Sequence, residues 1–223
     1  MTTPPDDEWP DTHLDPEALL RVLQDHDVRY VLVGGYAMVV YAVPDRLTMD
    51  IDIVPDRRTD NLENLATALR ALNARVVHYA DAHEIHAQRR PLTPELFEAN
   101  PFLHLYTARG RVDVLLAPTG LPEGYDGLIG RARVLDVDGL RITVADIRDL
   151  ITTKEATGRP RDLVDVRVLR ERLGADRGGR LGRVAEALDR SGTALEEPSG
   201  HRERGVSPAS GDVAQRPDPG LSL

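Results

Sequence analysis

The chain has 223 residues, 41% apolar and 29% charged, a composition that excludes disorder along the whole chain. It contains no cysteine, which excludes disulfides, thiolate metal sites and cysteine nucleophiles. The formal net charge is −9, yet residues 131–190 carry +3, a distribution that permits contact with a polyanion without requiring it.

Both ends of the chain have the composition of disordered tails. Residues 1–13 are acidic and proline-rich, unlike a secretory signal, and residues 191–223 are rich in Gly, Pro and Ser. Between them we expect a core over 14–144 and a helical segment over 145–190 that packs on it. No apolar run approaches the ~20 residues needed to span a bilayer, so we expect a cytoplasmic protein without a membrane partner.

The core is predicted to begin with a helix and a buried strand. Asp15-Pro16 and the leucines that follow are typical of a capped helix. The apolar run over 30–33 predicts a central strand that ends at Gly34-Gly35 and passes into a short helix over 36–42.

The next predicted strand alternates strictly over 48–54, which puts Met49, Ile51 and Ile53 on its core face. Leucines at helical spacing then predict a helix over 61–72. The remaining predictions are an edge strand at 76–77, hairpins over 102–116 and 133–144, and helices over 146–156 and 160–173. These elements indicate an α+β fold: a small mixed β-sheet flanked by helices and followed by a short helical segment.

Two acids, Asp50 and Asp52, stand two positions apart on the strand predicted over 48–54. Side chains at i and i+2 leave a strand on the same face, so these carboxylates should project together. Like charges that close repel unless a cation lies between them, and hard divalent cations prefer oxygen ligands. Since Ile51 and Ile53 require the opposite face to be core, the acidic face is either solvated or the wall of a metal cleft.

A third acid, Asp113, lies inside the apolar run over 111–116. Such an acid is costly unless it is paired or bound to metal. A salt bridge to Arg111 or to another arginine explains Asp113 as well as metal ligation does. Beside Asp50 and Asp52 on a neighbouring strand, however, it would complete a three-carboxylate site able to hold two Mg²⁺ ions.

Gly34-Gly35 and Lys154 are the features that would suit an anion. Glycine lets a phosphate approach the backbone, although a tight turn explains the pair more simply. Lys154 is the only lysine beside 27 arginines, and it follows the inward stripe of its helix seven positions after Ile147. A lysine there either snorkels to the edge or meets an anion, and the use of arginine everywhere else favours a specific need for an ammonium.

Weaker signals surround these residues. Arg46 and Thr48 precede the acidic pair and could reach a triphosphate or simply form part of a turn. Arg161, Asp162 and Asp165 open the last helix, where acids suit the helix dipole, so their position there needs no functional explanation.

Three segments together resemble the minimal nucleotidyltransferases of the polymerase-beta-like superfamily, and most closely their AbiEii-like (type IV toxin) branch. They are GGYAMVVYAVPDRLTMDIDIV, RVDVLL and KEATGRPRDLVDVRVL. That branch has a glycine pair that opens a helix, an R-x-T-x-D-I-D segment, a third aspartate on a later strand, and a lysine helix followed by an R-x-x-D-x-x-D-like helix. The resemblance covers residues 30–173.

The resemblance implies roles for the matching residues. Asp50 and Asp52 would ligate Mg²⁺ that bridges the triphosphate of an NTP, and Asp113 would bind a second Mg²⁺ and help to deprotonate an acceptor hydroxyl. In-line attack on the α-phosphate would then release pyrophosphate. The other implied site residues are Gly34, Gly35, Arg46, Thr48 and Lys154 for the nucleotide, with Arg161, Asp162 and Asp165 supporting them.

The same resemblance leaves the acceptor open between tRNA, a protein hydroxyl and a small molecule, and it implies a cognate antitoxin as a partner. The chain lacks the long carboxyl-terminal helical domain of full-length AbiEii toxins, which leaves a toxin role open. A non-catalytic nucleotide-binding or interaction module on the same fold is the main alternative, although all three acids are present. A DxD glycosyltransferase would need alternating strands and helices, which the hairpin-rich middle does not supply.

Overall fold

The structure is a computed structural model that describes residues 13–41, 43, 48–79, 85–88, 90–137 and 139–176. Arg46, the predicted tail and nearly all of the predicted leader lie outside these residues. The described strands are β1 (Tyr30–Val33), β2 (Asp50–Pro55), β3 (Arg75–Tyr79), β4 (Ile85–Gln88), β5 (Phe102–Thr107), β6 (Gly110–Leu115), β7 (Arg133–Val137) and β8 (Leu140–Val144). The described helices are α1 (Pro16–Asp25), α2 (Gly34–Val40), α3 (Thr59–Ala71), α4 (Pro94–Ala99), α5 (Gly124–Ile129), α6 (Ile147–Thr157) and α7 (Pro160–Asp176).

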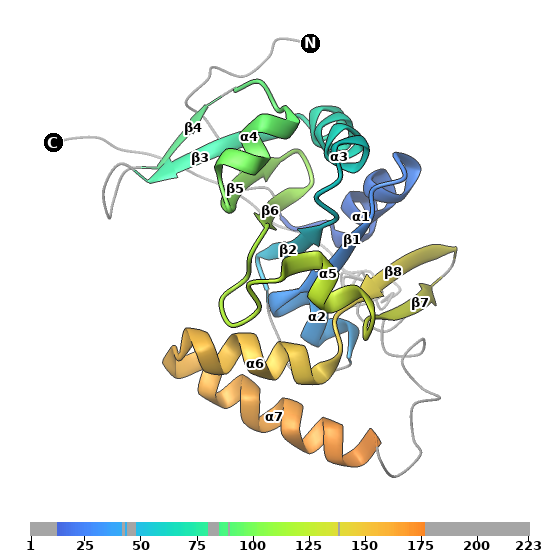
Figure 1. The fold of residues 1–223 in the computed structure, drawn as a ribbon, viewed down its shortest axis with the longest axis vertical. Coiled ribbons are helices and arrows are strands. Elements are labelled where there is room, and N and C mark those ends of the chain that lie inside the picture. Colours follow the sequence, from blue (N-terminus) through green and yellow to red (C-terminus); the bar gives the residue numbers. More distant parts are fainter. Residues whose placement is uncertain are drawn as a thin grey trace, which may run out of the picture.

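The eight described strands form one mixed sheet with the order β4-β3-β5-β6-β2-β1-β8-β7 (Figure 1). β2 pairs in parallel with β6 and β1 with β8, whereas the other neighbours are antiparallel. Both predicted hairpins are present, as β5–β6 and β7–β8. The mixed sheet with its helices confirms the predicted α+β class.

Two predictions about the sheet were wrong. Val76-Val77 is not at the edge, because β4 covers the outer side of β3 in the antiparallel register Val76↔Gln88. Met49 is not in the core: it is 65% exposed and precedes β2, so the strand begins two residues later than the alternation predicts. Ile51 and Ile53 are fully buried as predicted.

The first helix forms where its local signals predict it. The Asp15 carboxylate accepts a hydrogen bond from the backbone N–H of Ala18 at 3.1 Å, which caps the amino end of α1. Leu19, Leu20 and Leu23 are fully buried on its inner face. The helix packs against α3 and β8.

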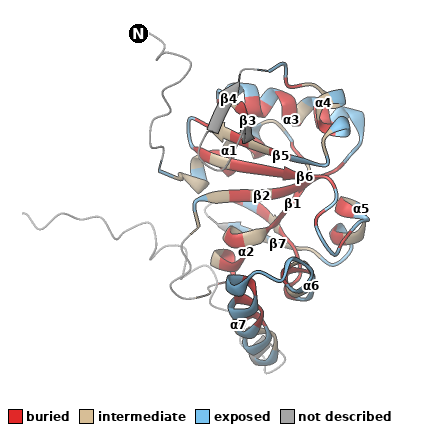
Figure 2. Cartoon of the chain, turned by 90° about the vertical axis from the view of Figure 1, so that its left-hand side faces the viewer, coloured by how far each residue is buried: buried red, intermediate tan, exposed pale blue. Residues whose placement is uncertain are grey.

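α6 and α7 lie side by side at the lower end of the molecule in Figure 1. Asp146 caps α6 by accepting a hydrogen bond from the Arg148 N–H at 2.9 Å, and Gly158 ends the helix with a φ of 66°. Figure 2 shows that much of α7 is exposed, whereas β1 and β2 in the middle of the sheet are largely buried. No helix in the described part of the chain is long and apolar enough to cross a membrane.

Candidate active site

The two acids of β2 and the acid of β6 lie on one face of the sheet. β2 and β6 are parallel neighbours, and their register sets Asp52 opposite Asp113 and Asp50 opposite Arg111. Residues opposite one another in a parallel pair point the same way, so all three carboxylates leave the same face. They line one cavity of about 320 Å³, together with Gly34, Gly35 and Lys154. The structure therefore brings together the acids that the sequence separates.

The glycine turn after β1 lies against Asp52. Gly34 has a φ of 66°, and a Cβ there would overlap the Asp52 carboxylate. The backbone N–H of Gly35 donates to Asp52 Oδ2 at 3.4 Å. Both glycines belong to the first turn of α2, which begins two residues earlier than the sequence predicts. In the structure, glycine at position 34 makes room for an aspartate.

Asp52 has an unusual charge environment. Burial, together with the negative charges of Asp50 and Asp113, raises the pKa of Asp52 to about 7, against the weaker opposing effects of the Gly35 N–H and Lys154. Near neutral pH this carboxyl is therefore only partly ionised when no cation is bound. A bound cation would favour the ionised form.

The neighbouring acids have partners of their own. Thr48 donates its hydroxyl to Asp50 at 3.0 Å, and Arg111 lies 3.7 Å from the same side chain. Asp113 does not pair with Arg111, the alternative that the sequence left open; instead its Oδ1 lies 2.9 Å from Nδ1 of His104. Sequence reasoning missed His104, although the hairpin register indicates it, because a turn that pairs Thr107 with Gly110 must also pair His104 with Asp113.

The donor chemistry of this cavity fits a hard divalent cation. In the described residues no three His, Asp or Glu side chains converge as a preformed metal site. Three carboxylates nevertheless share one face and cavity, and burial together with the other two acids raises the pKa of one of them, Asp52. The cavity is lined by as many acids as lysine and arginine residues, so a triphosphate would also need accompanying cations.

Lys154 faces inward as its spacing predicts, and the structure supplies its partners. Its side chain is 9% exposed, and its Nζ lies 2.6 Å from Asp165 Oδ2 and 3.4 Å from Asp162 Oδ1. The helix-dipole explanation for these two acids was therefore incomplete, because they hold a buried ammonium between α6 and α7. Asp162 Oδ2 has no hydrogen-bond partner among the described residues. Arg161 is exposed and lines the cavity.

A mixed sheet that carries paired acids on one strand, a third acid on its parallel neighbour and a glycine turn beside them is the arrangement implied by the nucleotidyltransferase resemblance. The family described as "Nucleotidyl transferase AbiEii toxin, Type IV TA system" matches residues 17–209. The chain belongs to this family and is a nucleotidyltransferase.

Solved structures give more distant likenesses. The antibiotic-resistance factor ANT(2″)-Ia is 14% identical, with 79% of this chain and 90% of that chain covered and a TM-score of 0.47. An antigenic nucleotidyltransferase-like protein from Paracoccidioides brasiliensis is 16% identical, with 78% and 84% covered and a TM-score of 0.45. Both TM-scores lie below 0.5, so the assignment rests on the family match. The search of curated proteins found no match.

Proposed function

We propose that the protein transfers a nucleoside monophosphate from an NTP to an acceptor hydroxyl, with Mg²⁺ held by Asp50, Asp52 and Asp113. The observation that carries this proposal is the parallel β2–β6 register, which sets Asp52 directly beside Asp113 in a cavity that also contains Lys154. When bound there, Mg²⁺ would neutralise the triphosphate and favour the ionised form of the acceptor hydroxyl.

The cationic side chains of the cavity would bind the phosphates. Arg159 and Arg161 line it and are exposed, so each can turn toward a ligand. The Lys154 ammonium is held by Asp165. It can donate a hydrogen bond to a phosphate oxygen only while it also donates to Asp165. We therefore assign the two arginines to capture of the nucleotide and Lys154 to the charge that develops on it. For Arg46, which the resemblance places with the nucleotide, the assignment stays a prediction.

The reaction would be one in-line displacement. The acceptor oxygen forms a bond to the α-phosphorus, the bond between that phosphorus and the β-phosphate oxygen breaks, and pyrophosphate leaves. The acceptor proton passes to the Asp113 carboxylate, whose orientation the His104 ring holds at 2.9 Å. Asp50 is held in the same way by Thr48 at 3.0 Å, so Thr48 acts through Asp50 rather than on the nucleotide.

The test is transfer of label from each of the four α-³²P NTPs in the presence of Mg²⁺ and cell extract. RNase and protease digestion of the products then assign the label to RNA, to protein or to a small molecule. We expect the wild type to label one of these fractions and Asp50→Ala/Asp52→Ala to label none. Asp25→Asn is the control, because Asp25 is exposed at the end of α1 and does not line the cavity of the three acids. Equal labelling by the double variant would exclude the mechanism.

We also propose that the protein acts as the toxin of a toxin–antitoxin pair, as its family description suggests. Induced expression should then arrest growth in the wild type but not in Asp50→Ala/Asp52→Ala. Arrest by both variants at equal protein levels would separate any toxicity from nucleotidyl transfer and favour a non-catalytic interaction.

A further inference from the structure

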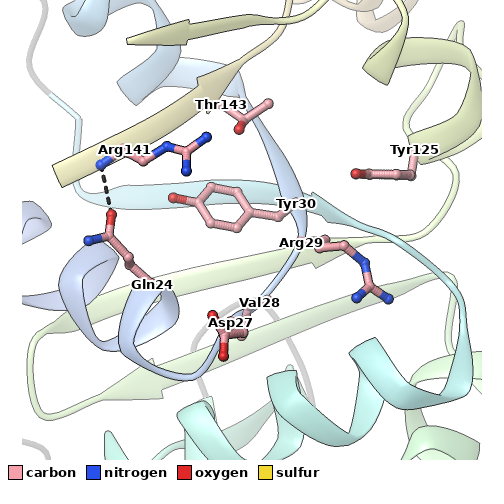
Figure 3. A pocket seen from close by; sticks show the side chains of 8 residues that line it. All are labelled: Gln24, Asp27, Val28, Arg29, Tyr30, Tyr125, Arg141 and Thr143. Carbon is pink, nitrogen blue, oxygen red and sulfur yellow. Dashed lines mark hydrogen bonds between the residues drawn. The ribbon is translucent and has the colours of Figure 1, made fainter. Parts of the chain in front are cut away.

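A second hollow lies at the amino end of β1, whereas Gly34 and the candidate active site lie at its carboxyl end. It has a volume of about 260 Å³ and is enclosed by the end of α1, β1, β8 and α5 (Figure 3). None of its lining residues lines the cavity of the three acids. The residues that matter here are Gln24, Tyr30, Tyr125, Arg141 and Thr143.

Tyr30 contributes an unsatisfied hydroxyl. The residue is 6% exposed, and its hydroxyl oxygen is buried without a hydrogen-bond partner among the described residues. Burial raises the pKa of Tyr30, so the hydroxyl keeps its proton and can donate it. Buried donors in folded proteins nearly always have an acceptor, and a missing one points to a group that the chain itself does not supply.

Arg141 and Thr143 complete the donor set from β8. They stand two positions apart, on the face of β8 opposite the buried Leu140, Ile142 and Val144. Figure 3 shows the Arg141 side chain above the Tyr30 ring, with Thr143 further along the strand. No hydrogen bond from the Arg141 guanidinium or the Thr143 hydroxyl to a described residue is present, whereas the Arg141 backbone is bonded.

One side chain of α1 helps to hold β8, which carries Arg141, in place. Gln24 accepts a hydrogen bond from the backbone N–H of Arg141 at 2.7 Å and donates to the carbonyl of Gly139 at 3.0 Å. Its amide thus fixes the β7–β8 hairpin to the end of α1. Preorganised donors lose less entropy when a ligand binds, so this clamp favours binding at the hollow.

The charges around the hollow limit what it can bind. Arg29 is already neutralised by Asp56 and Asp60, at 2.8 and 2.9 Å. The other charged residues that line the hollow are Arg141 and Asp27, which lie on opposite sides of the Tyr30 ring in Figure 3, and Asp136 stands opposite Arg141 in the β7–β8 register. The Arg141 guanidinium can neutralise one negative charge, and Asp27 would repel a second. The hollow therefore suits a ligand with a single negative charge better than one with two.

We propose that this hollow binds a singly charged oxyanion, either a carboxylate or a phosphodiester, which accepts hydrogen bonds from Tyr30, Arg141 and Thr143. Val28 and Tyr125 also line the hollow, so the group that carries the anion would meet apolar as well as polar side chains. The site is independent of nucleotidyl transfer and stands if that function fails.

The first experiment measures thermal unfolding of the full chain in acetate, dimethyl phosphate, sulfate and chloride at equal ionic strength. At ten times its Kd, a specific ligand should raise Tm by about 3 °C above the chloride value. A rise with acetate alone identifies a carboxylate, a rise with dimethyl phosphate alone identifies a phosphodiester, and a rise with both supports the shared chemistry. No rise above chloride, or a larger rise with sulfate, would overturn the proposal.

Two variants test the named donors. Without ligand, Tyr30→Phe should keep or raise Tm, because it removes a buried hydroxyl that has no partner. Both Tyr30→Phe and Arg141→Gln should lose the Tm rise with the effective anion, while Arg167→Gln, an exposed arginine of α7, should keep it. A fall in Tm for Tyr30→Phe without ligand, or a full anion response in either variant of the hollow, contradicts the proposal.

Discussion

Asp52 within β2 and Asp56 just after it stand four positions apart, and the fold shifts their pKa values in opposite directions. Burial would raise the pKa of Asp56, but the hydrogen bonds that it accepts from Arg58 and Arg29 outweigh burial and lower this pKa to about 2. At Asp52 burial is reinforced by two further acids, and the pKa rises to about 7. Desolvation opposes ionisation at both side chains, so the difference lies in the neighbouring charges: two arginines beside Asp56 and two acids beside Asp52.

Asp56 is an acid with a structural role, whereas Asp52 is an acid of the candidate active site. Asp56 is neutralised by the fold itself, through Arg29 at 2.8 Å and Arg58 at 2.7 Å. Asp52 has no ion pair with an arginine or lysine among the described residues. The hydration that its carboxylate loses on burial is therefore replaced only when a cation binds. A carboxylate without a positively charged partner lowers the stability of the protein. Such a carboxylate is typical of sites that bind cations.

The largest expected effect is on catalysis at Asp52. We expect Asp52→Asn to lower nucleotidyl transfer roughly a thousandfold or more, because the substitution removes a charged oxygen ligand. The same change should leave Tm unchanged or raise it, since it relieves repulsion from Asp50 and Asp113. Label transfer and thermal unfolding measure the two effects, and transfer within tenfold of the wild type would show that Asp52 is not required.

The next effect concerns the room that Asp52 needs. Gly34→Ala should destabilise the protein by about 3 kcal/mol, because the new Cβ is strained at positive φ and also overlaps the Asp52 carboxylate. Gly158→Ala is the matched control: it has the same φ of 66°, but its nearest neighbour is the Glu155 carbonyl oxygen at 3.7 Å, so about 1 kcal/mol is expected. Equal losses in urea denaturation would mean that Asp52 does not depend on this glycine.

Substitution of Asp56 should lower stability but not transfer, the opposite of what we expect for Asp52→Asn. We expect Asp56→Asn to lower the free energy of unfolding by about 2 kcal/mol, because a buried ion-pair network is broken while its arginines remain partly solvated. Transfer per folded molecule should stay within twofold of the wild type. A loss of transfer without a loss of stability would reverse the assigned roles.

The two acids also predict opposite pH dependences of stability. The Asp56 pKa is lowered on folding, so its contribution is present above the unfolded value of 3.8 and is lost as pH falls toward about 2. The Asp52 pKa is raised on folding, so the native state holds a proton that the unfolded state releases, and stability falls as pH rises from 3.8 to about 7. Urea denaturation in EDTA should show this fall between pH 4 and 7, and Asp52→Asn should flatten it.

The smallest expected effect is at His104. We expect His104→Gln to reduce transfer about tenfold, because a ligand carboxylate loses the group that orients it. Phe102→Leu is a useful comparison. The Phe102 ring packs edge-on against the His104 ring, with 4.4 Å between the ring centroids, but its side chain cannot form a hydrogen bond with the acids. A larger effect at Phe102 than at His104 would point to packing rather than to orientation of Asp113.

The sequence predicted those parts of the site that depend on local periodicity. Asp50 and Asp52 follow from alternation in one strand, and the inward position of Lys154 follows from helical spacing. The pairing of β2 with β6 is a long-range contact that no local pattern encodes, and so are the partners of Arg111 and Lys154. The sequence predicted neither α4 nor α5, although Thr93-Pro94 is a cap signal for α4; α5 begins at a glycine and is only six residues long.

The β2–β6 pairing also determines when the candidate site can exist. Asp50 and Asp52 leave the ribosome well before Asp113, and Lys154 follows later still. Because contacts between distant segments form slowly, a nascent or partly folded chain has its acids in place along the backbone but not yet beside one another. Assembly of the sheet thus delays formation of the candidate site until the chain has been synthesised beyond Lys154.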